Sequence, residues 1–174
     1  MGKLVNTTTM TVDALTDVGE WYVSEGGHDA AGRAQFEGAA GLLMGRKTYE
    51  GLAAYWPEQE GPWADLLNPL PKFVASRTLE GPLEWNATLL EGDAADAVAR
   101  LKDEHDGDLV LTGCGELARD LLGAGLIDEL RFWLHPSVGG EGTRPYEGER
   151  LRLRLLGSTT YDSGVTLLRY EPSR

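Results

Sequence analysis

The stretch that most constrains the fold is LVLTGCGELARDLL, residues 109–122. Leu109–Thr112 has the composition of a short buried strand, and the leucines after Glu116 fall on one face of a helix. Gly113 and Gly115 lie between them, and glycine lets a backbone turn tightly and approach a ligand closely. A strand, a glycine turn and a helix start form an anion site, because backbone N–H groups and the helix dipole both favour negative charge. A plain strand-to-helix turn also uses glycine, so this stretch alone leaves both interpretations open.

Two further strand ends carry residues that suit phosphate. The run LLMGRKT, residues 42–48, places Arg46, Lys47 and Thr48 at a helix start, and KFVAS, residues 72–76, is followed by Arg77. Ligands of open α/β sheets bind at the carboxyl ends of the strands, so the three junctions are expected to meet at one edge. Three phosphate-friendly turns predict a dinucleotide with an extra phosphate, namely NADPH, which an arginine fork pairs with well. Taken singly, each arginine is better explained as a solvated charge at a strand end, and only the three junctions together favour the phosphate site.

The order of the predicted elements indicates an α/β fold in one domain, residues 1–174. The expected strands are 3–12, 42–44, 72–76, 87–90, 109–112, 126–134, 150–155 and 165–170, and the expected helices are 29–40, 46–56, 93–105 and 116–122. Residues 13–27 are expected to form a long loop of the kind that often covers a site, and 58–71 a second loop. RLRLRL, residues 150–155, alternates strictly, which predicts an antiparallel C-terminal hairpin with one buried face on an otherwise mostly parallel sheet.

Composition excludes several function classes. The net charge of −12 argues against a nucleic-acid partner, and no apolar run is long enough to cross a membrane. The single cysteine and the absence of a signal pattern at the start predict a cytoplasmic protein. The three histidines lie far apart in the sequence without partners at ligand spacing, so we expect no metal site and expect His28, His105 and His135 to be packing or surface residues.

Three segments resemble known reductases. LLMGRKTYEGL, residues 42–52, resembles the dihydrofolate reductase signature that binds the NADPH phosphates, and PKFVASRTL, residues 71–79, resembles the next strand of that family. Residues 109–146 more closely resemble the reductase domain of the bifunctional riboflavin-biosynthesis deaminase–reductase and its stand-alone relatives. The resemblance implies a dihydrofolate reductase-like three-layer α/β/α fold, an NADPH-dependent oxidoreductase and a homodimer.

The resemblance also implies roles for individual residues. Those expected to hold the adenosine phosphate end are Arg46, Lys47, Thr48, Ser76 and Arg77, with Gly45 before them. Those expected at the pyrophosphate are Gly113, Cys114, Gly115, Glu116 and Leu117, with Thr112 at the strand end. Those expected to flank the nicotinamide are Thr9 and Thr16. Cys114 departs from the family pattern, which has a second glycine there.

The substrate end is less constrained by the sequence. Trp21 in the long loop is the candidate to close the site. Asp29 is the one acid nominated to orient or protonate substrate, since it falls near the place of the pterin-binding carboxylate, although a helix N-cap is the favoured alternative. Arg144 is the candidate for a substrate phosphate. The expected reaction is hydride transfer to a small heterocycle, most like 5-amino-6-(5-phosphoribosylamino)uracil. The alternatives are dihydrofolate as substrate, or a non-catalytic nucleotide-binding dimer.

Overall fold

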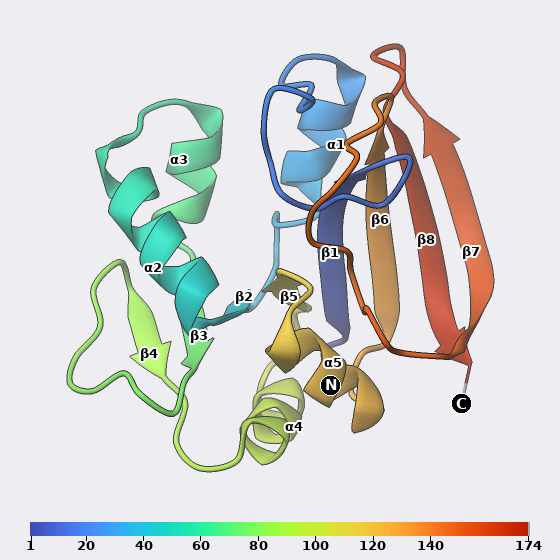
Figure 1. Cartoon of the computed structure of the whole chain (residues 1–174). Coiled ribbons are helices and arrows are strands. Elements are labelled where there is room, and N and C mark those ends of the chain that lie inside the picture. The colour runs from blue at the N-terminus through green and yellow to red at the C-terminus, as the bar shows by residue number, and fades with distance from the viewer. Residues whose placement is uncertain (174) are drawn as a thin grey trace.

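The computed structural model describes residues 1–173 and shows strands and helices alternating along most of the chain (Figure 1). The strands are β1 (Leu4–Thr11), β2 (Gly41–Gly45), β3 (Lys72–Ala75), β4 (Ala87–Leu89), β5 (Leu109–Thr112), β6 (Glu129–His135), β7 (Arg152–Thr160) and β8 (Thr166–Ser173). The helices are α1 (Gly27–Ala34), α2 (Arg46–Tyr55), α3 (Pro62–Leu67), α4 (Ala94–Glu104) and α5 (Glu116–Gly123), with a 3-10 turn at Trp56–Glu58.

All the strands of the described chain join one sheet. Its order is β4-β3-β2-β5-β1-β6-β8-β7. The strand pairs from β4 across to β6 are parallel, whereas β8 runs antiparallel to both β6 and β7. This confirms the mostly parallel mixed sheet with a C-terminal antiparallel hairpin that the sequence predicts.

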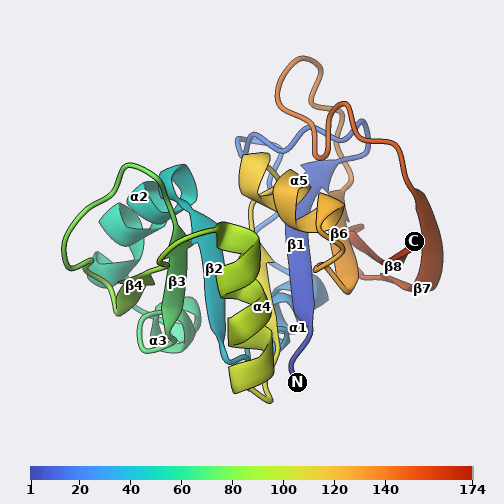
Figure 2. The same cartoon turned by 90° about the horizontal axis from the view of Figure 1, so that it is seen from below.

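The sheet is covered on both faces, because successive residues of a strand point to opposite sides. Leu43 and Leu109 belong to a core with residues of α4 and α5, which lie side by side in front of the sheet in Figure 2. Leu42, Met44 and Val110 belong to a second core with residues of α2 and α3. The neighbouring residues of β2 therefore pack into cores on opposite faces of the sheet. The sheet and the helices on its two faces are the predicted three layers.

Two helices differ from expectation. Residues 58–71, expected to be a loop, contain α3, which begins with Pro62 directly after Gly61 at φ 101°. Proline suits the first helical position, where its missing N–H costs nothing. The first helix is shorter than expected, since it ends at Ala34 and the chain turns through Gly38 at φ 77° before β2.

The last hairpin also differs in one respect. β7 starts two residues later than expected and is exposed on both faces, so the expected buried face is wrong within this chain. The cause is its place at the sheet edge, where only β8 borders it. Four leucines are 37–54% exposed there, namely Leu151, Leu153, Leu155 and Leu156.

A buried amide in β1 joins this strand to the end of β5. Asn6 of β1 is fully buried, and its Nδ2 donates to the carbonyl oxygens of Leu111 at 3.0 Å and Gly113 at 2.7 Å. Its Oδ1 accepts from the hydroxyls of Tyr146 and Thr8. All four hydrogen bonds are inside the protein, so this side chain fixes the Gly113 turn to β1 and to the loop that carries Tyr146.

Replacing Asn6 by alanine should therefore be costly. We expect Asn6→Ala to lower the free energy of unfolding by about 2–4 kcal/mol, because it leaves buried carbonyl and hydroxyl groups without partners. Tyr146→Phe removes only the bond to Asn6 Oδ1 and should cost less. Urea denaturation followed by tryptophan fluorescence measures both, and equal stability of Asn6→Ala and the parent protein would contradict the role of Asn6.

Candidate functional site

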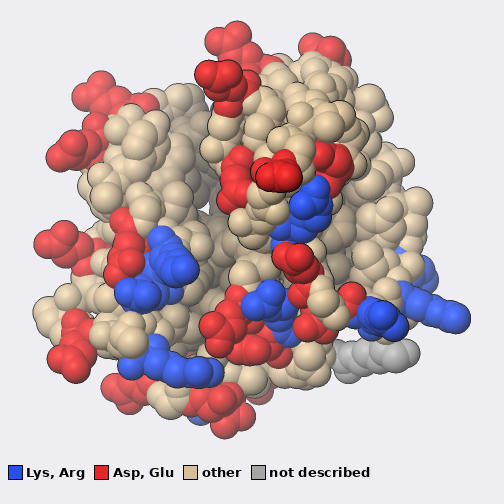
Figure 3. Space-filling view, viewed as in Figure 1, with Lys and Arg blue, Asp and Glu red and all other residues tan. Residues whose placement is uncertain are grey.

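A cleft of about 450 Å³ lies between the two halves of the molecule. Its volume is within the usual range of small-molecule sites. Figure 3 shows the hollow between the α2–α3 side and the α1 side. The cleft is lined from β1 by Thr7, Thr8 and Thr9, from the loop after it by Thr16, Val18 and Tyr22, and from the first helical region by His28, Asp29, Gly32, Gln35 and Phe36. The remaining lining residues are Leu42, Thr48, Leu52, Trp56, Trp63, Leu67, Thr112, Gly113, Cys114, Trp133 and His135.

The starts of α2 and α5 meet at one end of this cleft. Gly113 has φ 93°, and a Cβ there would lie 3.1 Å from the Thr48 hydroxyl oxygen. A Cβ on Gly45, the residue before α2, would lie 4.0 Å from Cβ of Leu117 in α5. The two junctions predicted from separate motifs are therefore adjacent, and Gly113 needs to be glycine for both its conformation and its closeness to Thr48.

Neither helix start has a side-chain cap. Gly45 precedes α2 and Gly115 precedes α5, and neither offers a side-chain hydrogen bond to the first turn. The start of α4 differs, because Asp93 accepts from the N–H groups of Ala95 and Asp96, as the sequence predicts. Uncapped first-turn N–H groups at α2 and α5 are available to an anion.

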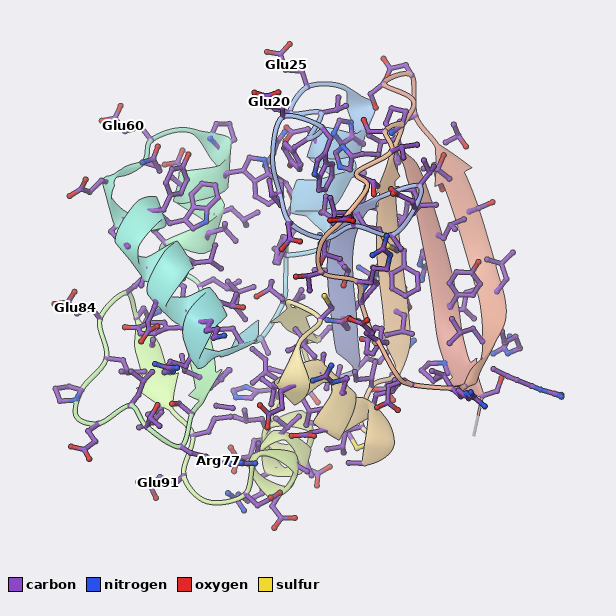
Figure 4. The ribbon with its side chains drawn as sticks, in the orientation of Figure 1. Glu20, Glu25, Glu60, Arg77, Glu84 and Glu91 are labelled. Carbon is purple, nitrogen blue, oxygen red and sulfur yellow. The ribbon has the colours of Figure 1, made fainter. Side chains whose placement is uncertain are left out.

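The predicted cations lie beside this end rather than in the cleft lining. Gly45 pairs with Ala75 across β2 and β3, which puts Arg46 and Ser76 at the same sheet edge. Arg46 is exposed and lies 3.7 Å from Glu50. Lys47 and Arg77 are also exposed, and Figure 4 shows Arg77 at the lower edge of the view. The Ser76 hydroxyl accepts from the N–H groups of the next turn and shapes it.

The predicted residues at the pyrophosphate and nicotinamide divide into two groups. Those that line the cleft are Thr9, Thr16, Thr112, Gly113 and Cys114, and Thr48, predicted at the adenosine phosphate end, lines it as well. Those that follow Cys114 in the sequence and do not line the cleft are Gly115, Glu116 and Leu117. The Cys114 thiol lies 3.8 Å from the Thr16 hydroxyl, and burial raises the pKa of that thiol, so it stays protonated near neutral pH.

The other end of the cleft is built from α1, α2 and α3. Asp29 lies in the first turn of α1, where Gly26 is the N-cap, so the favoured capping role of Asp29 is wrong. Its Oδ1 accepts from Trp63 Nε1 at 2.6 Å and its Oδ2 pairs with Arg33. Trp63 also packs edge-on against Phe36, with ring centroids 5.8 Å apart. A held carboxylate and two aromatic rings therefore form this wall.

Two histidines that are distant in sequence are brought together. His28 Nε2 donates to the carbonyl oxygen of Val23 at 2.9 Å, and the Val23 N–H donates to Nδ1 of His135 at 3.0 Å. The ring centroids are 5.7 Å apart. Burial, with the neighbouring His28, lowers the pKa of His135 to about 4, which keeps it neutral at physiological pH. His28 and His135 are thus buried packing residues, joined through the N–H and the carbonyl group of one residue of the long loop, Val23.

Trp21 and Arg144 do not line the cleft. Trp21 Nε1 donates to the carbonyl oxygen of Asp17 at 2.8 Å, and it is Tyr22 that lines the cleft and stacks on His135 at 4.8 Å. The Arg144 guanidinium is exposed and donates to the carbonyl oxygens of Gly140 and Gly142 in its own loop. Within residues 1–173, no cluster of three or more potential metal ligands occurs and no helix is long and apolar enough to cross a membrane.

The long loop after β1 is fastened to the glycine-rich loop after β6. Asp13 accepts from the N–H groups of Gly139 and Gly140, and these bonds, with that of Thr11, hold the pKa of Asp13 well below its usual range. Gly139 packs so closely that a Cβ would lie 2.3 Å from the Leu15 side chain. The loop is therefore part of the packed structure and supports one wall of the cleft.

The lowered pKa of Asp13 predicts a pH dependence of stability. The folded protein holds the ionised carboxylate, so its contribution is complete above the usual aspartate pKa of about 4 and is lost as pH falls toward the lower folded value. Asp13→Asn should lower the urea midpoint near neutral pH and weaken its fall from about pH 5 to pH 3. Asp106→Asn, at an exposed carboxylate, is the control. Parallel pH profiles for the parent and Asp13→Asn would contradict the assignment.

The fold and the cleft define an α/β protein with a mostly parallel sheet and one small-molecule cleft at its central strands. The chain belongs to the RibD C-terminal domain family, which matches residues 3–167. This confirms the resemblance seen in residues 109–146.

Individual relatives support the same fold. The uncharacterised protein YyaP of Bacillus subtilis (strain 168) is 29% identical over 136 residues, which are 74% of this chain and 72% of YyaP. The crystal structure of a candidate riboflavin biosynthesis protein from Shewanella sp. PV-4 is similar with a TM-score of 0.79 and 22% identity, covering 99% of both chains. The Thermotoga maritima diaminohydroxyphosphoribosylaminopyrimidine deaminase/5-amino-6-(5-phosphoribosylamino)uracil reductase has a TM-score of 0.70 and 11% identity, and the match covers 99% of this chain and 57% of that one.

Proposed function

We propose that the protein is an NADPH-dependent reductase that transfers a hydride to a small heterocyclic substrate. The observation that carries this proposal is the meeting of two uncapped helix starts, those of α2 and α5, beside a row of threonines in one cleft. The family and its reductase relatives support the reaction class. Cysteine usage fits a reducing compartment, so we place the protein in the cytoplasm.

The residues present fit a nicotinamide dinucleotide. The start of α5 after Gly113 offers N–H groups to a pyrophosphate, and Arg46, Lys47 and Arg77 stand near the start of α2 and the end of β3 for the phosphate of the adenosine end. The Thr112 hydroxyl oxygen lines the cleft region, is buried, and has no hydrogen-bond partner within residues 1–173. A ligand with polar groups along the β1 and β5 strand ends would satisfy it.

The protein's part in the reaction is binding, orientation and exclusion of water. When bound, the reduced nicotinamide supplies the hydride. Thr9 and Thr16 flank the place proposed for its ring, and Tyr22 and Trp133 give the cleft apolar cover. Asp29 is oriented by Trp63 and Arg33, so it can accept an N–H of a substrate ring and hold that ring in register.

The second candidate is a nucleotide-binding protein without turnover. It is favoured by the fact that both oxygens of Asp29, the nominated acid, already have partners. A fluorescence titration with NADPH followed by measurement of NADPH oxidation separates the two. The first compounds to supply are 5-amino-6-(5-phosphoribosylamino)uracil and dihydrofolate. Binding without oxidation by any heterocycle would favour the second candidate.

The cofactor assignment predicts a preference for NADPH over NADH. Arg46→Ala and Arg77→Ala should each weaken NADPH by about 1.5–3 kcal/mol, because a charged hydrogen bond to the 2′-phosphate is lost, and should leave NADH little changed. Arg152→Ala, an exposed arginine of β7, is the matched control. Equal losses for both cofactors would show that these arginines do not bind the phosphate.

We also propose a homodimer formed through β7. This strand is a sheet edge of nine residues, and its exposed leucines Leu153 and Leu155 lie on one face, which is unusual for an edge that stays free in solution. Light scattering should give about twice the 18.9 kDa chain mass. Leu153→Glu with Leu155→Glu should give the monomer, with Val12→Glu as the control at another exposed apolar residue. A parent protein that stays monomeric at high concentration would remove this proposal.

A further inference from the structure

The substrate end of the cleft has no cation to receive a phosphate. Among residues 1–173, neither a lysine nor an arginine lines the cleft. Arg33 adjoins this end, but its guanidinium is paired with Asp29 and lies over the Trp63 ring at 5.9 Å. Arg144, expected from the sequence to reach a substrate phosphate, is bound to its own loop. A phosphate dianion placed here would meet no cation that is free of another ion pair, and a charge without an opposite charge in a half-enclosed site is costly.

The same end offers flat apolar walls and acceptor atoms. Phe36, Trp56 and Trp63 line it, and the planes of Trp56 and Trp63 are 38° apart with centroids 6.5 Å apart. Aromatic walls accept a planar ring by stacking. Asp29 supplies a carboxylate, and Gln35, also in the lining, carries a buried Oε1 without a hydrogen-bond partner in the described chain. These are acceptors, so they suit a ring that presents N–H groups or a positive charge.

The rim around this end is acidic. Figure 4 shows Glu20 and Glu25 at the loop that leads into α1 and Glu60 at the connection that leads into α3, all in the upper part of the view, whereas Arg77, Glu84 and Glu91 lie lower. Figure 3 shows red groups on both sides of the upper opening, whereas red and blue groups are mixed lower down. In a chain of net charge −12, this rim repels a second anion at the substrate end.

We infer that the substrate is a planar, unphosphorylated heteroaromatic compound, neutral or cationic, which stacks in the Phe36–Trp56–Trp63 end of the cleft. The inference takes the type of reaction from the proposed function and narrows the class of substrate for that reaction. It departs from the sequence expectation of a phosphorylated pyrimidine, because that expectation placed Arg144 at the substrate.

A matched pair of ligands tests the inference. The first is 5-amino-6-(5-phosphoribosylamino)uracil and the second is the same compound after phosphatase treatment, with 7,8-dihydrobiopterin as a third, unphosphorylated ring. Binding is followed by quenching of the cleft tryptophans, with and without saturating NADPH. We expect the unphosphorylated compounds to bind more tightly than the phosphorylated one, by roughly threefold or more at low salt, with the gap shrinking as salt screens the rim. Tighter binding of the phosphorylated compound, or no binding of either unphosphorylated ring, would overturn the inference.

Three variants test whether charge causes the preference. Gln35→Lys adds a cation to the lining and should raise affinity for the phosphorylated compound alone by about tenfold, whereas Gln35→Met, of similar length, should not. Glu20→Gln with Glu25→Gln and Glu60→Gln changes only exposed residues and should raise the same affinity at low salt. If both Gln35→Lys and the triple glutamate variant leave the preference for the unphosphorylated compounds unchanged, charge does not set that preference and the inference is wrong.

The outcome is separable from that of the proposed function. NADPH binding and its loss in Arg46→Ala report on the cofactor, whereas the ligand pair is compared on binding without NADPH as well as with it. A protein that binds the unphosphorylated ring but never oxidises NADPH keeps the substrate class and loses the reductase. A protein that oxidises NADPH only with the phosphorylated compound keeps the reductase and loses the substrate class.

Discussion

The Asn6 amide is the interaction on which the cleft most depends. It lies in the central strand β1, directly opposite Leu111 of β5, and it binds the carbonyl oxygens on both sides of Thr112. The β5 strand ends and the Gly113 turn begins at that place. A buried amide with all its groups paired tolerates little displacement, since each lost bond leaves a polar group unsatisfied. The position of the α5 start relative to β1 is thereby fixed before any ligand binds.

The close approach of α2 and α5 follows from that anchor and from small residues. A Cβ on Gly45, before α2, would lie 4.0 Å from Cβ of Leu117 in α5. A Cβ on Gly113, before α5, would lie 3.1 Å from the hydroxyl oxygen of Thr48 in α2. Two helix dipoles then point their positive ends toward one region in a protein with excess negative charge overall. The uncapped N–H groups of two helix starts therefore lie at one end of the cleft, whereas Glu20, Glu25 and Glu60 are exposed near α1 and α3. This division is what connects the fold to a choice of ligands.

Sequence patterns predicted the features whose cause is local. The alternation of strands and helices, the Asp93 cap and the glycine turn after Thr112 all follow from residues within a few positions of each other. Helix α3 was missed because its prolines and Gly61 favoured a loop, although Pro62 after a glycine is a helix-start signal. The Asn6 bonds and the link of Val23 to two histidines could not be predicted, because their partners are more than 100 residues apart or on another element. The alternation of residues 150–155 correctly indicated a strand, but a strand pattern does not say which surface covers its apolar face.

The loop after β1 shows why the cleft is largely formed in advance. The 15-residue stretch between β1 and α1, residues 12–26, would lose much conformational entropy if it closed only on binding. Here that cost is met during folding, because Asp13 and Asp17 bind N–H groups of the 137–148 loop and Val23 is held between His28 and His135. Tyr22 is carried into the lining by the same contacts. Binding energy is then free to select the ligand by shape and charge, and no lysine or arginine of the described chain is among the residues that line the cleft.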